Sequence, residues 1–169
     1  MLLINCSNRE NNCYKILNDI KSNDDKFISL SNKDMKFCLG CLSCSEKLEK
    51  HCVLSDYISN NVYEELIKAN DIIFASPMYM GTINGVLKNL LDRLHPFYNH
   101  KLLSGKKIYL VMSGHATKEE NEEEITGIIH YFEVISTYFD FKFEFLDYFS
   151  FNDSEYSRKI DGIKERFNR

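Results

Sequence analysis

The sequence has few of the residues that break a chain into separate units. Its 169 residues include only two prolines and seven glycines, and no stretch is rich in Pro, Gly or Ser. It also contains no internal repeat and no low-complexity segment. We therefore expect residues 1–169 to form one domain, which at this length can bury a core without disulfides or a structural metal.

Long apolar runs and an excess of basic residues are also missing. No stretch approaches the roughly 20 apolar residues that cross a bilayer. The short apolar start at residues 1–6 has no basic residue before it, unlike a secretory signal. A net charge of -4 with scattered Lys and Arg offers no electrostatic footprint for nucleic acid. We expect a cytoplasmic protein that binds neither membranes nor nucleic acid.

Five short apolar runs alternate with segments of helical period. The runs cover residues 2–6, 26–30, 71–76, 107–113 and 142–151. Such alternation is typical of βαβ units, and the continuously apolar stretches 72–75 and 108–112 indicate strands covered on both faces. We therefore predict an α/β fold around a parallel sheet. Helices are expected near residues 13–20, 58–66, 87–94, 125–132 and 156–167.

The loop after the first predicted strand is rich in hydroxyl, amide and guanidinium groups. It leads directly into a predicted helix, whose free N–H groups and dipole favour an anion such as phosphate. An ordinary polar turn with an Asn cap is the alternative interpretation. The loop is not a dinucleotide fingerprint, because it lacks Gly-x-Gly-x-x-Gly. Its candidate phosphate ligands are Ser7, Arg9, Asn12 and Cys13.

The third predicted strand ends in Ser-Pro-Met-Tyr-Met-Gly at residues 76–81. Ligands of open parallel sheets bind at the carboxyl ends of the strands. Pro77 is expected to fix a turn directly after the strand, and Met78, Tyr79 and Met80 offer flat or polarizable apolar surface there. The alternative is that these side chains simply cap the core.

Four of the six cysteines follow the spacing Cys38-x2-Cys41-x2-Cys44-x7-Cys52. Reduced cytoplasmic thiols at such spacing indicate metal binding or redox chemistry more than structural disulfides. The first three match the compact run of bacterial ferredoxins, although Val53 follows the fourth where those proteins have Pro. A [4Fe-4S] cluster, a tetrahedral zinc and a Cys41–Cys44 dithiol all remain open.

Four motifs taken together resemble the NADPH-dependent FMN reductase family and the related iron-sulfur flavoproteins. They are Ile-Asn-Cys-Ser-x-Arg at residues 4–9, Cys-Leu-Gly-Cys-Leu-Ser-Cys at 38–44, the 76–81 motif, and Leu-Lys-Asn-Leu-Leu-Asp-Arg-Leu at 87–94. The resemblance implies a flavodoxin-like three-layer sandwich with a five-stranded parallel sheet in the order 2-1-3-4-5. In the iron-sulfur flavoproteins a compact run of this type carries the cluster, so the resemblance supports a [4Fe-4S] site on the Cys-rich loop at about 36–55. Many reductase-like relatives keep a similar stretch without a cluster, as a packed loop near the flavin, which is a fourth interpretation.

The resemblance also implies where FMN binds. The FMN phosphate is expected at the loop after the first predicted strand, and the isoalloxazine ring at the loop after the third. Gly114 and His115 lie in a second flavin loop, after the fourth predicted strand, near the pyrimidine edge of the ring. His115 is expected to tune the redox potential of the flavin, or else to be an exposed loop histidine. The family usually has Gly at the position of Cys6 and Thr at that of Cys13, so we expect weaker phosphate binding. The implied ring-side residues are Ser76, Pro77, Met78, Tyr79, Met80 and Gly81.

The resulting function hypothesis is an NAD(P)H-dependent flavin oxidoreductase. It would pass a hydride from NAD(P)H through FMN to a small-molecule or redox-protein acceptor, with no acid-base residue assigned to catalysis. One alternative is an iron-sulfur flavoprotein that relays single electrons, and another is a binding module that has lost FMN. Relatives suggest a homo-oligomer with a subunit contact near Asp92 and Arg93, whereas the residues alone suggest a surface ion pair there.

Overall fold

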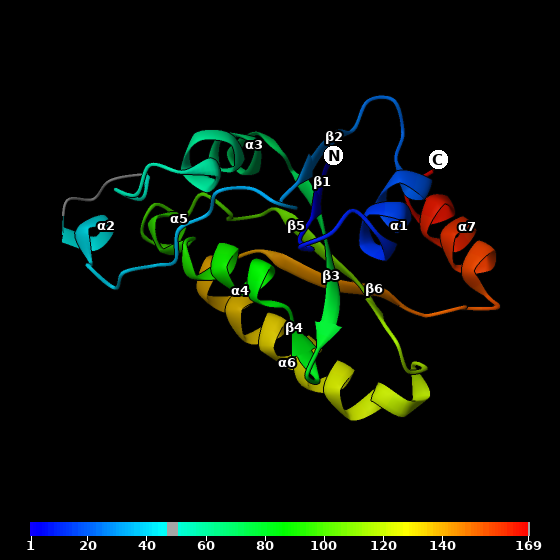
Figure 1. The fold of residues 1–169 in the computed structure, drawn as a ribbon. Coiled ribbons are helices and arrows are strands. Elements are labelled where there is room, and N and C mark those ends of the chain that lie inside the picture. Colours follow the sequence, from blue (N-terminus) through cyan, green and yellow to red (C-terminus); the bar gives the residue numbers. More distant parts are fainter. Residues whose placement is uncertain (47–50, 169) are drawn as a thin grey trace.

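The computed structural model describes residues 1–46 and 51–168 and shows a sheet between two layers of helices (Figure 1). The strands are β1 (Leu2–Asn5), β2 (Lys26–Ser29), β3 (Asp71–Tyr79), β4 (Thr82–Ile83), β5 (Lys107–Gly114) and β6 (Lys142–Ser150). The α-helices are α1 (Asn12–Ile20), α2 (Ser43–Glu46), α3 (Tyr63–Lys68), α4 (Gly85–Asp92), α5 (His95–Asn99), α6 (Glu122–Phe139) and α7 (Tyr156–Arg166). A π-helical turn at Ile58–Val62 precedes α3, and a 3₁₀ turn at Glu119–Asn121 precedes α6.

The sheet has the order β2-β1-β3-β5-β6, and all pairs on this path are parallel. The order predicted for five parallel strands is therefore confirmed. The additional strand β4 is short and pairs antiparallel with the end of β3. The chain therefore has a six-stranded sheet in which five strands form the expected parallel core.

Two hydrophobic cores lie on opposite faces of the sheet because successive strand side chains point to opposite sides. In β1, Leu3 packs with α1 and α7 in one core, whereas Leu2 and Ile4 belong to the core beneath α3, α4 and α6. The ribbon shows the same division, with α1 and α7 on one side of the strands (Figure 1). Both faces of the central strands are covered, which explains their continuously apolar sequences.

The end of β3 differs from the prediction. The chain does not turn directly after the apolar run at Pro77, because β3 continues to Tyr79. Pro77 lies opposite Ser113, and Met78 pairs with Ile83 in a hairpin. A strand accommodates proline where the ladder needs no N–H donor. The turn itself falls on residues 80 and 81, which both have positive φ.

The Cys-rich loop predicted at about 36–55 contains α2 as its one helix among the described residues. Residues 47–50 of that predicted loop lie outside the described part of the chain. No helix among the described residues combines the length and the apolar character needed to cross a membrane.

Candidate functional site

A cavity of about 250 Å³ lies at the carboxyl ends of β1, β3 and β5. The direction of the connections changes between β1 and β3, so this is the place where open parallel sheets bind ligands. Four segments that are far apart in the sequence contribute to its walls. The lining residues are Ser7, Arg9, Asn11, Asn12, Cys13, Pro77, Met78, Tyr79, Ser113, Gly114, His115 and Phe151.

The end of the cavity formed by the loop after β1 carries hydrogen-bond donors and the positive charge of Arg9. The Oγ atom of Ser7 accepts a hydrogen bond from the backbone N–H of Arg9 at 3.2 Å and donates to the Arg9 carbonyl oxygen at 2.8 Å, which folds the loop. Asn11 stands at the N-cap of α1 but forms no side-chain cap. No carboxylate is among the lining residues that the structure describes. This donor set suits a phosphate group.

Cys13, which lines this end of the cavity, and Cys6, which follows β1, are both buried. Burial raises the pKa of the Cys13 thiol to about 12, although a hydrogen bond with Ser113 acts in the opposite direction. Burial also raises the pKa of Cys6, and the charge of Cys13 adds to the effect. Both side chains are therefore neutral thiols at neutral pH, and neither is a nucleophile.

The other end of the cavity presents aromatic and polarizable surface. Met78 is half-buried, and Tyr79 is exposed over 41% of its surface. The rings of His115 and Phe151 are stacked, with centroids 6.0 Å apart and planes inclined by 3°. Flat surfaces of this kind suit a planar aromatic ligand.

The loop after β5 is held close to β6. A Cβ atom added at Gly114 would overlap the hydroxyl of Tyr148, so only glycine fits against that ring. The same hydroxyl donates to the carbonyl oxygen of Ala116 and accepts from the Nδ2 atom of Asn121, each at 3.1 Å. These contacts fix the position of the backbone beside His115.

Three predicted ring-side residues do not line the cavity. Ser76 is fully buried, and its Oγ atom donates to the Oδ1 atom of Asn84 at 3.3 Å. Asn84 in turn caps α4 by accepting from the backbone N–H of Leu87 at 3.0 Å. Met80 and Gly81 form the turn between β3 and β4, where the side chain of Met80 is fully exposed.

The cavity also includes residues that the sequence prediction missed, namely Asn11, Ser113 and Phe151. The available signal for Phe151 was its place at the end of the last apolar run. Parallel strands end at one edge of the sheet, so the residue after β6 lies near the residues that follow β3 and β5.

Helix α2, which belongs to the Cys-rich loop, lies beyond the end of α4 that is farther from β4 (Figure 1). Cys38 and Cys41 are exposed, whereas Cys44 and Cys52 are half-buried. Burial raises the pKa of the Cys44 thiol, and the charges of Cys52, Cys41 and Cys38 raise it further.

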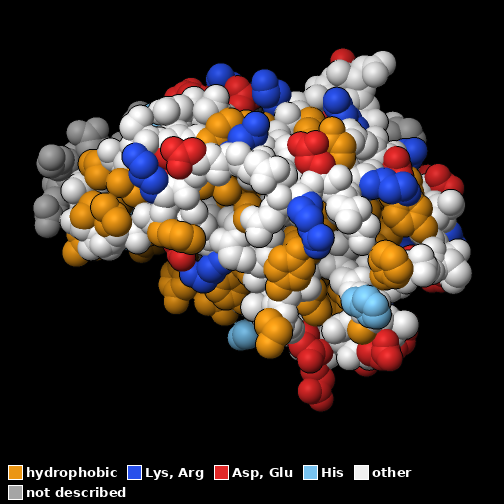
Figure 2. Space-filling model, viewed as in Figure 1, with side chains coloured by type: hydrophobic (Ala, Val, Ile, Leu, Met, Phe, Trp, Pro, Cys, Tyr) orange, Lys and Arg blue, Asp and Glu red, His pale blue; other side chains and the backbone are white. Residues whose placement is uncertain are grey.

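This part of the molecule presents both sulfur and apolar surface. The Sγ atom of Cys44 lies 3.2 Å from the Nδ1 atom of His95. Hydrophobic side chains are visible at the end of the molecule that carries α2 (Figure 2). The exposed ones near the cysteines are Phe37, Leu39, Leu42 and Val53. Within residues 1–46 and 51–168, no three His, Cys, Asp or Glu side chains are arranged to hold a metal ion.

Sequence comparison relates the chain to known flavoproteins. A family model described as NADPH-dependent FMN reductase matches residues 1–134. An iron-sulfur flavoprotein of Methanocaldococcus jannaschii is 33% identical over 118 residues, which cover 69% of this chain and 58% of that protein. The chain thus spans a little over half the length of this curated relative.

Solved structures confirm the flavodoxin-like fold. A WrbA-like flavodoxin of Agrobacterium tumefaciens aligns with a TM-score of 0.68 at 10% identity, covering 99% of this chain and 94% of the other. An FMN-dependent NADH-azoreductase of Bacillus anthracis, solved in complex with FMN, has a TM-score of 0.63 at 14% identity, with 99% and 97% coverage. At these identities the likeness establishes the fold alone.

Proposed function

Because this chain belongs to the NADPH-dependent FMN reductase family, we propose that its cavity binds FMN and that the protein is an NAD(P)H-dependent flavin oxidoreductase. The observation that supports this most is that the two ends of the cavity differ in chemistry. Its Arg9 end, at the start of α1, offers cationic and N–H donors to a phosphate, and the end with Tyr79 and Phe151 offers flat apolar surface to a ring.

Bound FMN would supply the redox chemistry, namely acceptance of a hydride from NADH or NADPH and delivery of electrons to a small-molecule or redox-protein acceptor. The residues of the chain bind and orient. Arg9 balances phosphate charge, while Met78 and Tyr79 cover ring surface that water would otherwise contact. The fixed backbone at Gly114 holds the loop that presents His115. No side chain is assigned to proton transfer.

FMN titration of the flavin-free protein tests the binding proposal. Arg9→Ala removes a charged donor, so we expect the dissociation constant to rise about 10-fold or more. Arg158→Ala is the matched control because Arg158 is an exposed arginine that forms a surface ion pair with Glu155. Equal affinities for the wild-type protein and Arg9→Ala would exclude Arg9 from the phosphate site.

Anaerobic mixing with NADH or NADPH tests the activity. Rapid bleaching of the bound flavin by either nucleotide supports the reductase, and the faster one identifies the preferred donor. Bleaching only by a reduced donor protein would instead support an electron carrier. A protein that stays colourless and gains no thermal stability from added FMN would be the flavin-free binding module.

A second candidate function is an iron-sulfur flavoprotein that holds a [4Fe-4S] cluster on Cys38, Cys41, Cys44 and Cys52. It is supported by the position of these four free thiols on one segment and by the likeness of the chain to an iron-sulfur flavoprotein. Four thiolates are the donor set that such a cluster requires. Iron and acid-labile sulfide in anaerobically purified protein test this assignment. Both should be lost in Cys41→Ser and kept in Cys13→Ser, because Cys13 is buried elsewhere. Zinc without sulfide, or no metal at all, would contradict it.

We further propose that residues 1–169 form one domain that assembles as a cytoplasmic homo-oligomer. One sheet contains both the first strand, β1, and the last strand, β6, which supports a single unit. Light scattering on the purified protein measures the subunit number, and a monomer at micromolar concentration would contradict the oligomer.

A further inference from the structure

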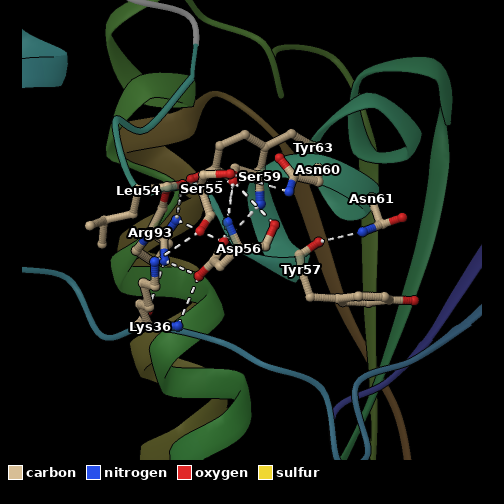
Figure 3. A network of polar contacts seen from close by, with 10 residues as sticks. All are labelled: Lys36, Leu54, Ser55, Asp56, Tyr57, Ser59, Asn60, Asn61, Tyr63 and Arg93. Atoms are coloured by element: carbon tan, nitrogen blue, oxygen red, sulfur yellow. Dashed lines mark hydrogen bonds and ion pairs between the residues drawn. The ribbon is translucent and has the colours of Figure 1, made fainter.

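A buried ion pair lies at the base of the segment that carries the four cysteines (Figure 3). The Nη1 atom of Arg93 donates to the Oδ2 atom of Asp56 at 2.7 Å, and its Nη2 atom donates to Oδ1 at 3.2 Å. Both side chains are fully buried. Arg93 follows α4, and Asp56 precedes the π-helical turn.

The same guanidinium binds both stems of this segment, which we define as residues 37–53. Nη1 of Arg93 also donates to the carbonyl oxygen of Lys36 at 2.7 Å, and Nη2 donates to that of Leu54 at 3.3 Å. Lys36 directly precedes the cysteine segment, and Leu54 directly follows it. One side chain therefore joins the two places where the segment begins and ends.

Asp56 closes the arrangement from the other side. Its Oδ2 atom accepts from the backbone N–H of Lys36 at 2.8 Å, and its Oδ1 atom accepts from that of Ser59 at 3.1 Å. The hydroxyl of Tyr63 donates to the carbonyl oxygen of Arg93 at 2.5 Å, which fixes the end of α4 (Figure 3). Each stem is thus tied to the ion pair and, through it, to α4.

We propose that Arg93 and Asp56 are positioning residues that bring the four thiols of the cysteine segment together by joining its two stems. The inference deepens the second candidate function, since it concerns the same thiols. A segment of this length loses conformational freedom when its ends are joined. Joining the stems shortens the mean separation of Cys38 and Cys52, which each lie two residues from a stem residue.

Arg93 positions the stems through the geometry of its guanidinium contacts rather than through its positive charge. The guanidinium of Arg93 is paired with the carboxylate of Asp56, so the pair is neutral overall. The guanidinium supplies four N–H donors from two nitrogens in a fixed plane, whereas a lysine ammonium is a single point charge. Arg93→Lys therefore keeps the charge and loses the simultaneous contact with both stems.

Both members of the ion pair can be replaced together by apolar residues, which leaves no charge buried. Exchanging a buried ion pair for apolar side chains is often neutral for stability, whereas removing one partner is strongly destabilising. The double variant Arg93→Met with Asp56→Leu should therefore fold and keep FMN affinity within about two-fold of wild type. It cannot join Lys36 to Leu54.

Disulfide formation between Cys38 and Cys52 tests the proposal without any metal. The background is Cys41→Ser with Cys44→Ser, the oxidant is diamide, and the product is counted by mass spectrometry. We expect Arg93→Lys and the double variant to form the disulfide at least five-fold more slowly than the background protein. Lys88→Met is the control, because Lys88 forms an exposed ion pair on the same helix. Equal rates in all four proteins would overturn the proposal.

Binding of Co²⁺ to the reduced wild-type cysteines gives the second readout. We expect thiolate-to-cobalt absorption in wild type and Lys88→Met, and at least 10-fold weaker binding in Arg93→Lys and the double variant. If wild type binds no Co²⁺ but the disulfide rates still differ, the metal-binding function fails and the positioning role stands. If Arg93→Lys binds Co²⁺ as wild type does, the geometric role is overturned.

Discussion

The Sγ atom of Cys13 lies 3.2 Å from the Oγ atom of Ser113, which links the first turn of α1 to the end of β5. Both residues line the cavity at the carboxyl edge of the sheet. The two loops that the proposed phosphate site and ring site depend on are therefore in direct contact. A change at this contact should alter cofactor binding more than it alters the fold.

Replacing Cys13 with threonine should strengthen FMN binding. A hydroxyl at this position adds a hydrogen-bond donor to the phosphate end of the cavity, and one such bond contributes about 1 kcal/mol, or roughly five-fold in affinity. Fluorescence titration with FMN measures the change. Cys13→Val is the control, because it has the shape of threonine without the hydroxyl; an equal gain in both variants would show that packing is responsible.

Alanine at position 114 should weaken FMN binding and lower thermal stability. The new Cβ atom would overlap the Tyr148 hydroxyl and lie 3.0 Å from the adjacent ring carbon, so the loop or the ring must move. Combining Gly114→Ala with Tyr148→Phe should restore part of the loss. Thermal unfolding and FMN titration of the two single variants and the double variant measure this coupling, and strictly additive effects would contradict it.

Acid should weaken the contact between the two stems of the cysteine segment. Burial alone would raise the pKa of Asp56, but hydrogen bonds from Arg93, Lys36 and Ser59 lower it below its usual range. Because the pKa of Asp56 is lower in the folded protein than in the unfolded chain, its carboxylate stabilises the fold at pH values above the unfolded pKa of about 4. This stabilisation is lost as the pH falls through the pKa of Asp56 in the folded protein.

Denaturant unfolding from pH 7 to pH 2 measures that dependence. The wild-type free energy of unfolding should fall below about pH 4, and the Arg93→Met, Asp56→Leu double variant should show a shallower fall. Asp92→Asn serves as the control, because Asp92 is exposed and pairs with Lys88. Parallel curves for wild type and the double variant would show that other carboxylates govern the acid transition.

His115→Ala should lower the midpoint potential of bound FMN. The imidazole is expected to stabilise negative charge on the reduced flavin, and a loss of about 1 kcal/mol corresponds to roughly 20 mV for a two-electron couple. Potentiometric titration of the reconstituted protein measures this shift. His130→Ala, an exposed histidine on α6, is the control, and an unchanged potential in His115→Ala would remove this residue from the mechanism.

The sequence predicted the sheet and most of the cavity because both follow from short-range patterns. Strands β1, β3 and β5 were visible as apolar runs, and parallel strands bring the residues that follow them to one edge. Ser7, Tyr79 and His115 accordingly line one cavity in the structure. The turn was misplaced at Pro77, because a proline after an apolar run does not reveal that the strand continues into a hairpin.

Long-range pairing was not predictable from the sequence. Asp92 and Arg93 suggested a surface ion pair, and this interpretation is wrong, because neighbours in a helix point in different directions. Asp92 pairs with Lys88 on the exposed face, whereas Arg93 is buried and pairs with Asp56. No local signal in the sequence connects positions 56 and 93, because they lie 37 residues apart in the chain.

Helix α4 connects strand β3 to the stems of the cysteine segment. Its start is attached to β3 through Ser76 and Asn84, and its end is attached to the cysteine segment through Arg93. Its eight residues measure about 12 Å along the axis. Inserting one residue would rotate Arg93 by about 100° away from Asp56. A change in the length of this helix would therefore break the connection between β3, which contributes to the cavity, and the two stem residues Lys36 and Leu54.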